Sequence, residues 1–279
     1  MSFSYDVKEE LSKSNTFGNE QLILCELFGY ACSTNFKRTK NKYEFSTSNE
    51  YNINRYGKML AKLGIEYKIK MRGNKFLIDF NSSKIDSSRI EAKNEEEKKA
   101  IIRGAFMGGG SVNEPNNKYH LEIILSSEEL SNTICKYINE FGIEIKQMER
   151  ANGYSLYIKD GENISNLLAI MGASKSVVRY EEIRVLKDKR NNINRIVNCE
   201  TANLNKTINA SILQIEAIKK IQKKGKFDEL PESLREIAKL RQENPEMSLV
   251  ELGELLKKPI GKSGVNHRLN NLIKIANEL

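Results

Sequence analysis

Apolar and polar residues follow the same pattern twice along the first 172 residues of the chain. An apolar helical segment runs into three glycines at Ile102–Gly110, and Leu27–Asn35 is a weaker copy 75 residues earlier. Two further pairs of segments recur 76 to 78 residues apart: Lys42–Phe45 with Lys118–Leu121, and Leu63–Glu66 with Phe141–Glu144. This near-constant spacing indicates a duplicated structural unit.

Each copy predicts the same order of elements. A glycine-bearing helix is followed by a hairpin-like segment, an amphipathic helix and a second pair of strands. The hairpin segments are 43–48 and 119–125, the amphipathic helices 52–63 and 129–141, and the second strand pairs 65–80 and 143–158. Helices and strands that do not alternate singly favour an α+β fold. We therefore predict a duplicated αββαββ domain, with copies at about 15–81 and 94–172.

The connection between the copies, 82–99, is polar and charged. Its second half is predicted to be helical, because Asn94 and Glu97 have the spacing of a capping box. After the duplication, a long basic helix is predicted from Ser174 to Asn198. Asparagine-rich residues then interrupt the pattern, so we expect a polar linker at 198–207. The first domain would span 1–197 and the second 208–279.

The second domain has only helical patterns. The expected buried positions are Ile208, Ile212, Ile215 and Ile218 in the first helix, then Leu252, Leu255 and Leu256, and finally Val265, Leu269, Leu272, Ile273 and Ala276. Pro231 opens the second helix, and Ser248 with Glu251 forms a capping box for the third. A break at Lys258–Gly261 precedes the last helix. A short helix, a tight break and a further helix predict a helix-turn-helix from Ser248 to Ile275.

The start of the last helix carries side chains suited to nucleic acid. The expected outward residues are Lys262, Ser263, Asn266, His267 and Arg268, with Lys274 further along. Asparagine can pair with adenine and arginine with guanine, whereas lysine and serine suit phosphates. Arg195 and Lys206 are further candidates for phosphate contacts, and the asparagines around them would either join those contacts or cap helix ends. The alternative is an ordinary helical bundle with a solvated face.

Composition supports a polyanionic partner without requiring one. The net charge is +8, and residues 205–279 hold 14 Lys and Arg against 10 Asp and Glu. No apolar stretch reaches the roughly 18 residues that span a bilayer. The four cysteines are far apart in sequence, which indicates a reducing cytoplasm rather than disulfides or a zinc ribbon. Two histidines exclude a histidine-rich metal site, and we expect no metal and no cofactor.

The glycines of the repeated helices have a structural interpretation. Gly104 and Gly108 stand four residues apart, on one helix face, and Gly29 and Ser33 offer the same arrangement in the first copy. Small residues there would allow the two helices to approach more closely than the usual 8–10 Å. We therefore expect a pseudo-twofold core with one sheet on each side.

These features together resemble the LAGLIDADG homing-endonuclease fold. In that family an acidic residue before the last motif glycine binds catalytic Mg²⁺. The corresponding residues here are Gly109 and Thr34, which supply no carboxylate. Glu114 lies beyond the expected end of the helix and is a poor substitute. The resemblance therefore implies a scaffold that has lost its nuclease chemistry.

The chain resembles the WhiA family more specifically, through Arg103–Pro115, Asn194–Thr207 and Lys262–Leu269. These are bacterial sporulation and cell-division regulators with a degenerate homing-endonuclease domain and a C-terminal helix-turn-helix. The resemblance implies sequence-specific binding of duplex DNA without cleavage, control of transcription, and a place at the nucleoid. Two alternatives stay open: an N-terminal scaffold or sensor for a protein or ligand, with the basic tail as DNA anchor, and an active endonuclease.

Overall fold

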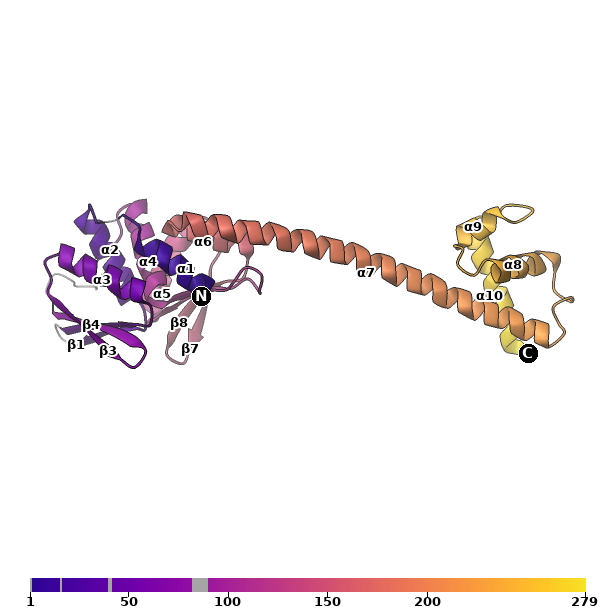
Figure 1. The fold of residues 1–279 in the computed structure, drawn as a ribbon, viewed down its shortest axis with the longest axis horizontal. Coiled ribbons are helices and arrows are strands. Elements are labelled where there is room, and N and C mark those ends of the chain that lie inside the picture. Colours follow the sequence, from indigo (N-terminus) through magenta and orange to yellow (C-terminus); the bar gives the residue numbers. More distant parts are fainter. Residues whose placement is uncertain (1, 16, 40–41, 82–89) are drawn as a thin grey trace. The chain divides into compact units, whose positions relative to one another are not determined.

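The computed structural model describes residues 2–15, 17–39, 42–81 and 90–279. The chain divides into two compact units, Met1–Asp188 and Lys189–Leu279 (Figure 1). Of the predicted connection between the copies, 82–89 lies outside the described residues. The remainder contains the start of a helix at Glu95, with Asn94 as its N-cap.

Unit 1 contains two copies of one arrangement of helices and strands. The first copy comprises α2 (Glu20–Ala31), β1 (Phe36–Thr39), β2 (Lys42–Thr47), α3 (Glu50–Lys62), β3 (Tyr67–Arg72) and β4 (Lys75–Asn81). The second comprises α4 (Glu95–Gly109), β5 (Gly110–Val112), β6 (Leu121–Leu125), α5 (Glu128–Glu140), β7 (Lys146–Arg150) and β8 (Gly153–Ile158). Two helices lie outside the repeat, α1 (Phe3–Ser12) and α6 (Gly161–Met171).

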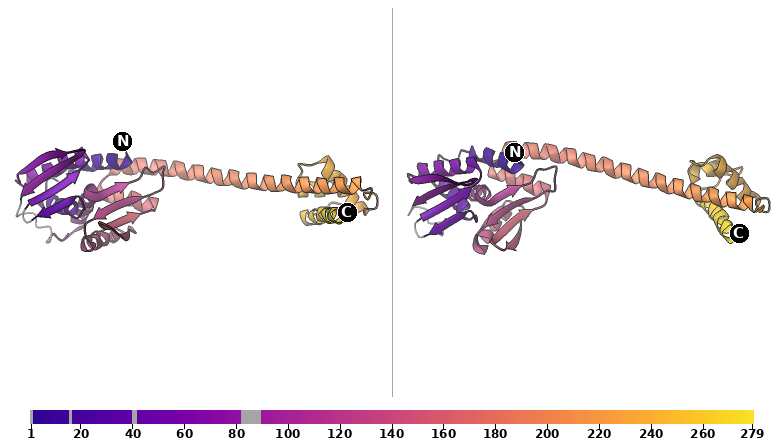
Figure 2. Two further views of the ribbon diagram at one scale, coloured as in Figure 1. Left: turned by 90° about the horizontal axis from the view of Figure 1, so that it is seen from below. Right: turned by 60° about the horizontal axis from the view of Figure 1, so that its bottom comes forward.

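The two sheets have identical topology. Their strand orders are β1-β2-β4-β3 and β5-β6-β8-β7, and every neighbouring pair is antiparallel. The helices of unit 1 lie on one side of both sheets (Figures 1 and 2). Gly64 and Gly142 end the equivalent helices α3 and α5 with positive φ angles of 69° and 75°, a conformation that glycine adopts at little cost. The predicted duplicated αββαββ fold is confirmed.

The centre of unit 1 is the crossing of α2 and α4. A β-carbon on Gly104 would collide with the backbone carbonyl of Glu26, and one on Gly29 with that of Ile101. Glu26 and Ile101 occupy equivalent positions of the two copies, so the contacts at the crossing are related by a pseudo-twofold axis. The absence of side chains at both glycines therefore sets how closely the two helices approach, as the sequence predicts.

A buried ionic network lies beside this crossing. Glu26 of α2 is fully buried and accepts hydrogen bonds from the guanidinium of Arg55 on α3, with Nη2 2.8 Å from Oε2. Arg103 of α4 approaches the same oxygen at 3.3 Å and donates from Nε to the carbonyl of Met171. Arg55 also donates to the carbonyls of Ser12 and Ser14. Removal of one partner would leave a buried charge uncompensated, which typically costs roughly 3–5 kcal/mol of stability.

Unit 2 is helical. It contains the later part of α7 (Ser174–Lys223), α8 (Glu232–Glu243), α9 (Leu249–Glu254) and α10 (Lys262–Glu278). Its core joins Ile218 and Ile221 of α7 to Ile237 of α8, Leu252 of α9 and Leu269 of α10. At its other end, α7 is capped by Glu10 of α1, which accepts hydrogen bonds from the backbone amides of Lys175 and Ser176 at 2.7 and 2.8 Å.

The expected helix end near Asn198 is wrong. Helix α7 continues through 198–207 without a break, and the compact units divide between Asp188 and Lys189. The interpretation of the asparagines there as caps also fails, because no helix ends among them. Every residue from 188 to 210 is exposed, so a polar sequence that resembles a linker is equally compatible with a solvated helix.

Three expected core positions are also wrong. Ile208 and Ile212 of α7 are 42% and 48% exposed, and Leu255 after α9 is 51% exposed. The helical period places Ile208 and Ile212 on one face, but α7 becomes buried only from Ser211 onward, and then on one side. Helical periodicity shows which residues share a face of the helix. It does not show at which residue that face begins to pack against other helices.

We predict that Gly104→Ala destabilises unit 1. The added methyl group meets backbone at the helix crossing, so the cost should be at least the roughly 1–3 kcal/mol of ordinary overpacking. Gly18→Ala is the matched control, since nothing lies within 4 Å of a β-carbon there. Urea unfolding of the full chain, with hydrogen exchange of α2 and α4 amides, measures both. Equal exchange in the two variants would contradict the prediction.

Candidate nucleic-acid interface

Helices α9 and α10 are held in a defined helix-turn-helix. Ser248 accepts a hydrogen bond from the Glu251 amide, and the Glu251 carboxylate accepts one from the Ser248 amide at 2.7 Å, which completes the predicted capping box. The connection between the helices is closed by Ile260, whose amide donates to the Gly253 carbonyl at 3.2 Å. A β-carbon on Gly253 would collide with the Ile260 carbonyl. Glycine is therefore needed for this turn.

The loop before α9 is fixed by a buried arginine of α8, on the same helix face as Leu234, Ile237 and Ala238. Arg241 of α8 is 1% exposed, and its Nη1 donates to the carbonyls of Met247, Pro245 and Asn244 at 2.7, 3.3 and 3.4 Å. Burial lowers the pKa of this guanidinium. Ser211 of α7 donates to the Pro245 carbonyl at 2.6 Å. The carbonyls that precede α9 are thus bound by Arg241 of α8 and by Ser211 of α7.

Helix α10 has one buried and one exposed face. The buried residues are Val265, Leu269, Leu272 and Ala276, as predicted, whereas Ile273 is only partly covered. Of the candidate contact residues, Lys262, Ser263, Asn266, His267 and Lys274 are exposed, and Arg268 is half-buried. The period of 100° per residue places Asn266 and Arg268 on opposite flanks of the exposed face. The structure therefore brings the α10 candidates onto one helix, with Arg268 at its margin.

Two asparagines on this face were missed. Asn270 is exposed, and the half-buried Asn271 lies with its Nδ2 3.3 Å from Nε2 of His267. Both lie one helical turn beyond candidates already identified, at the i+3 and i+4 positions that share a face. The spacing was therefore a sufficient signal to find them.

Arg195 and Lys206 do not join this set. Both are exposed on α7 and, 11 residues apart, lie on the same side of that helix. Arg195 precedes Ser211, the first buried residue of this part of α7, by about 24 Å at 1.5 Å per residue. Their assignment as phosphate contacts stays a prediction, separate from the α10 face.

The position of the missing nuclease acid has no room for a side chain. A β-carbon on Gly109 would collide with the backbone carbonyl of Ile124 on β6. The nearby carbonyls that end α4 are bound by side-chain amides of the first copy: Asn52 donates to Met107 at 2.6 Å and Asn35 to Gly108 at 2.9 Å. Glu114 lies beyond the helix, 3.5 Å from Arg179. An acid at Gly109 would require strand β6 to move.

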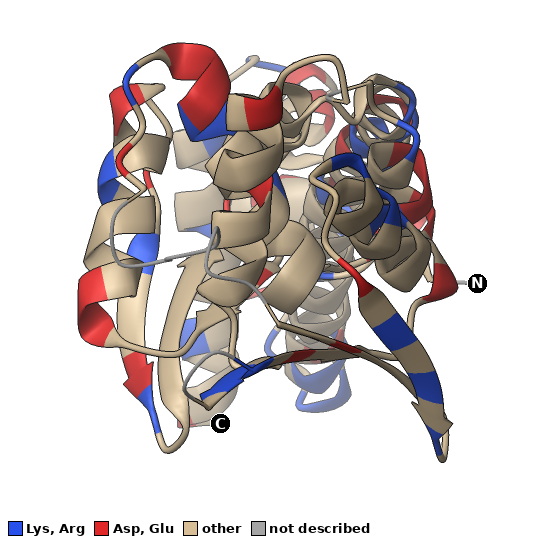
Figure 3. Ribbon diagram, turned by 90° about the vertical axis from the view of Figure 1, so that its left-hand side faces the viewer, with Lys and Arg blue, Asp and Glu red and all other residues tan. Residues whose placement is uncertain are grey.

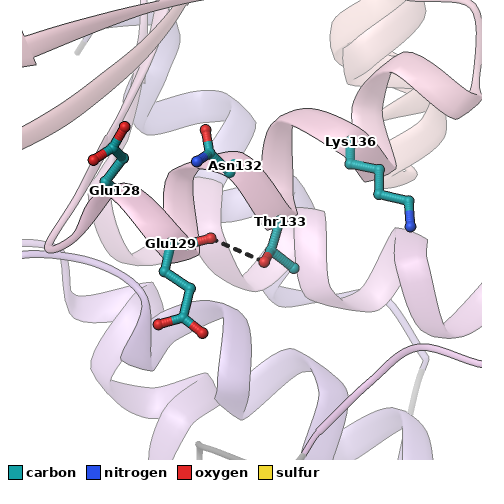
Figure 4. Close-up of a pocket in the computed structure, with 5 residues that line it drawn as sticks. All are labelled: Glu128, Glu129, Asn132, Thr133 and Lys136. Carbon is teal, nitrogen blue, oxygen red and sulfur yellow. Dashed lines mark hydrogen bonds between the residues drawn. The ribbon is translucent and has the colours of Figure 1, made fainter.

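Two other surface features of unit 1 are a hollow on α5 and a basic edge strand. The hollow in Figure 4, about 460 Å³, is lined by five residues of α5, and a hydrogen bond within it joins the Thr133 hydroxyl to the Glu129 carbonyl at 2.9 Å.

Basic residues alternate along the edge strand β3 as Lys68, Lys70 and Arg72 (blue in Figure 3). In the described parts of the chain, no group of three acidic, histidine or cysteine side chains is placed to hold a metal ion.

Comparison with known proteins gives the same two domains. The WhiA LAGLIDADG-like domain matches residues 31–87 and 98–190, and the WhiA C-terminal HTH domain matches 193–276. A probable cell division protein WhiA from Clostridium perfringens is 52% identical over 195 residues, which are 70% of this chain and 61% of that protein. Its counterpart from Clostridium tetani is 45% identical over 247 residues, 88% of this chain and 74% of that protein.

A solved structure covers the whole chain. The crystal structure of full-length DUF199/WhiA from T. maritima has a TM-score of 0.64 and 29% identity, and the match covers 100% of this chain and 99% of that one. Fold and site therefore define a protein with a LAGLIDADG-like domain joined to a helix-turn-helix domain. The chain belongs to the WhiA family. Among the described helices, none is both long and apolar enough to cross a membrane.

We predict a local acid sensitivity at the start of α9. The amide of Ser248 holds the pKa of Glu251 below its ordinary value of 4.5. A carboxyl group with a lowered pKa in the folded state stabilises the fold above its unfolded pKa, and this contribution is lost as the pH falls through the folded pKa. Amide chemical shifts of α9, followed by NMR below pH 5, should report this loss.

Glu251→Gln is the matched control for this titration. The glutamine amide oxygen can accept the same hydrogen bond but has no proton to gain, so the α9 shifts should no longer follow the pH. Identical acid titrations of α9 in the two proteins would contradict the assignment to Glu251.

Proposed function

We propose that this protein is a sequence-specific duplex-DNA-binding regulator of transcription that acts without cleaving DNA. The observation that supports it most is the exposed polar face of α10, opposite the buried stripe of Val265, Leu269 and Leu272. In helix-turn-helix proteins the N-terminal residues of the second helix contact base edges in the major groove. Residues 262–268 would occupy that position here.

The proposed contacts divide by chemistry. Asn266 and Arg268 have the side chains that pair with adenine and guanine, and we assign them to base edges. Lys262, Ser263 and Lys274 would contact phosphates, and His267, supported by Asn271, would lie between the two groups. Because Arg268 is half-buried, its guanidinium would extend from the flank of the helix toward the groove.

The link to cell division and sporulation rests on the family. The relatives from C. perfringens and C. tetani are described as probable cell division proteins, and the first of them is matched over only 61% of its length. We infer that this chain acts at the nucleoid, on promoters of genes for division and sporulation. The N-terminal domain would then modulate binding, either on DNA or through a partner.

One observation favours a partner surface on the N-terminal domain. The edge strand β3 is exposed along its whole length, and Ile69 and Met71 are 45% and 68% exposed between Lys68, Lys70 and Arg72. Lysines on an edge strand oppose pairing with another strand, whereas basic residues beside exposed apolar ones suit contact with an acidic partner surface. This second role, as a scaffold or sensor, is compatible with DNA binding by α10.

We predict distinct effects of base-contacting and phosphate-contacting variants. Arg268→Ala should cost about 1–3 kcal/mol on the specific site and relax specificity there, whereas Lys274→Ala should weaken all duplexes similarly and reduce the salt slope by about 1. Fluorescence anisotropy at several fixed salt concentrations measures both, with a site selected from a random duplex library. The control is Asn277→Ala, near the end of the same helix. Unchanged affinity of Arg268→Ala for the selected site would count against α10 as the reader.

We predict no nuclease activity. The full chain, incubated with supercoiled plasmid and Mg²⁺, should leave the plasmid intact, because neither Gly109 nor Thr34 offers a carboxylate and Gly109 has no room for one. An active homing endonuclease serves as the positive control. Mg²⁺-dependent nicking that co-purifies with this chain would overturn the prediction.

A further inference from the structure

A cavity of about 270 Å³ opens where α1, the first sheet and the end of α4 meet. Its lining is rich in hydroxyl groups and includes two lysines. The lining residues include Ser4 and Lys8 from α1, Ser46 near the end of β2, Ser48 just after β2, Lys75 at the start of β4, and Gly108 from α4. No described residue that lines it is acidic. This cavity lies beside the end of α4 and takes no part in the proposed DNA contacts of α10.

Lys8 is the unusual member of this lining. Its side chain is partly buried, and this burial lowers its pKa to about 8. Among the described residues it has no hydrogen-bond or ion-pair partner; its one recorded contact is with the Phe106 ring, whose centroid is 5.7 Å from Nζ. Buried charges are normally paired, because an unpaired charge loses its hydration without compensation. The cavity therefore offers a position for a counter-anion of Lys8.

The nearby carboxylates do not supply that anion. Asp6 is paired with Arg179 at 2.7 Å, and Glu9 with Lys13 at 2.7 Å. Glu50, at the start of α3, accepts a hydrogen bond from the Tyr5 hydroxyl at 3.3 Å. Each of these carboxylates thus has another partner, and none of the ion pairs among the described residues includes Lys8.

Two helix N-termini add to the positive character of the cavity. Ser2, the N-cap of α1, and Asn49, the N-cap of α3, both line it. The positive ends of helix dipoles favour anions. The C-terminal end of α4 also reaches the cavity, but the carbonyl of Gly108 is already bound by the amide of Asn35. Its hydrogen-bonding capacity is therefore directed away from a ligand.

We propose that this cavity binds a phosphate group, with Lys8 as its principal charge partner, Lys75 at its mouth and the serine hydroxyls as hydrogen-bond donors. The hydroxyls of Ser4 and Ser48 have no recorded hydrogen bond among the described residues, so they are available to donate. The phosphate comes either from a small phosphorylated molecule or from a DNA backbone.

The test uses the full chain and inorganic phosphate as the probe, by titration calorimetry at constant ionic strength. Lys8→Met keeps the length of the side chain and removes a buried charge, so the variant should fold. We expect it to bind phosphate at least about tenfold more weakly, as loss of a charged hydrogen bond implies, and Lys75→Met to show a smaller loss. The matched control is Lys13→Met on the same helix, where the side chain is 67% exposed; it should bind as the unaltered protein does.

A second arm measures duplex-DNA affinity of the same variants. If Lys8→Met loses phosphate and keeps its DNA affinity, the site takes a small phosphorylated molecule. If DNA affinity also falls, the site takes a backbone phosphate. The proposal is overturned if neither phosphate binding nor DNA binding responds to Lys8→Met. Variants of α10 that abolish DNA binding should leave the phosphate titration unchanged, so failure of one proposal is distinguishable from failure of the other.

Discussion

The close approach of α2 and α4 is the constraint on which unit 1 depends. Gly29 and Gly104 lie where each helix meets the backbone of the other, and no side chain fits at either point. In each copy the strands of the sheet come directly after the crossing helix in the chain, so the position of that helix constrains where its sheet begins. The same approach brings Asn35 and Asn52 of the first copy to the final carbonyls of α4. Gly109, at the position that the homing-endonuclease resemblance assigns to an acid, therefore lies directly against the backbone of β6.

The sequence was sufficient to predict the fold because its signals lie within short segments and recur in both copies. The glycine spacing and the capping residues each predict a helix, and the constant offset between copies predicts the duplication. The same reasoning failed at 198–207, because asparagines suit a linker and a solvated helix alike. It did not find Lys8, because the burial of a charged side chain depends on neighbours distant in sequence. For α10 the helical period correctly predicted which residues are buried, apart from Ile273. Asn270 and Asn271 were missed because the candidates at the start of the helix were not extended by one more turn.

Unit 2 shows how a small helical domain fixes the orientation of its last helix. Four apolar residues of α10 fix its rotation about its own axis, and Gly253 and the capping box of α9 fix where it begins. Arg241 adds polar ties to the loop before α9. The exposed side chains are then placed by these restraints rather than by contacts of their own, which leaves them available to a ligand.

The Glu26 network has a consequence for assembly between chains. Glu26 corresponds to Ile101 in the second copy, and Arg103 corresponds to Phe28 in the first, so each of these charged residues has an apolar counterpart in the other copy. Two first-copy helices from different molecules, if they crossed in the same way, would bring two buried glutamates together without Arg103. Two second-copy helices would bring two arginines together without a glutamate. The ionic asymmetry therefore favours the pairing of a first copy with a second copy over the pairing of two like copies, although the glycines alone would permit either.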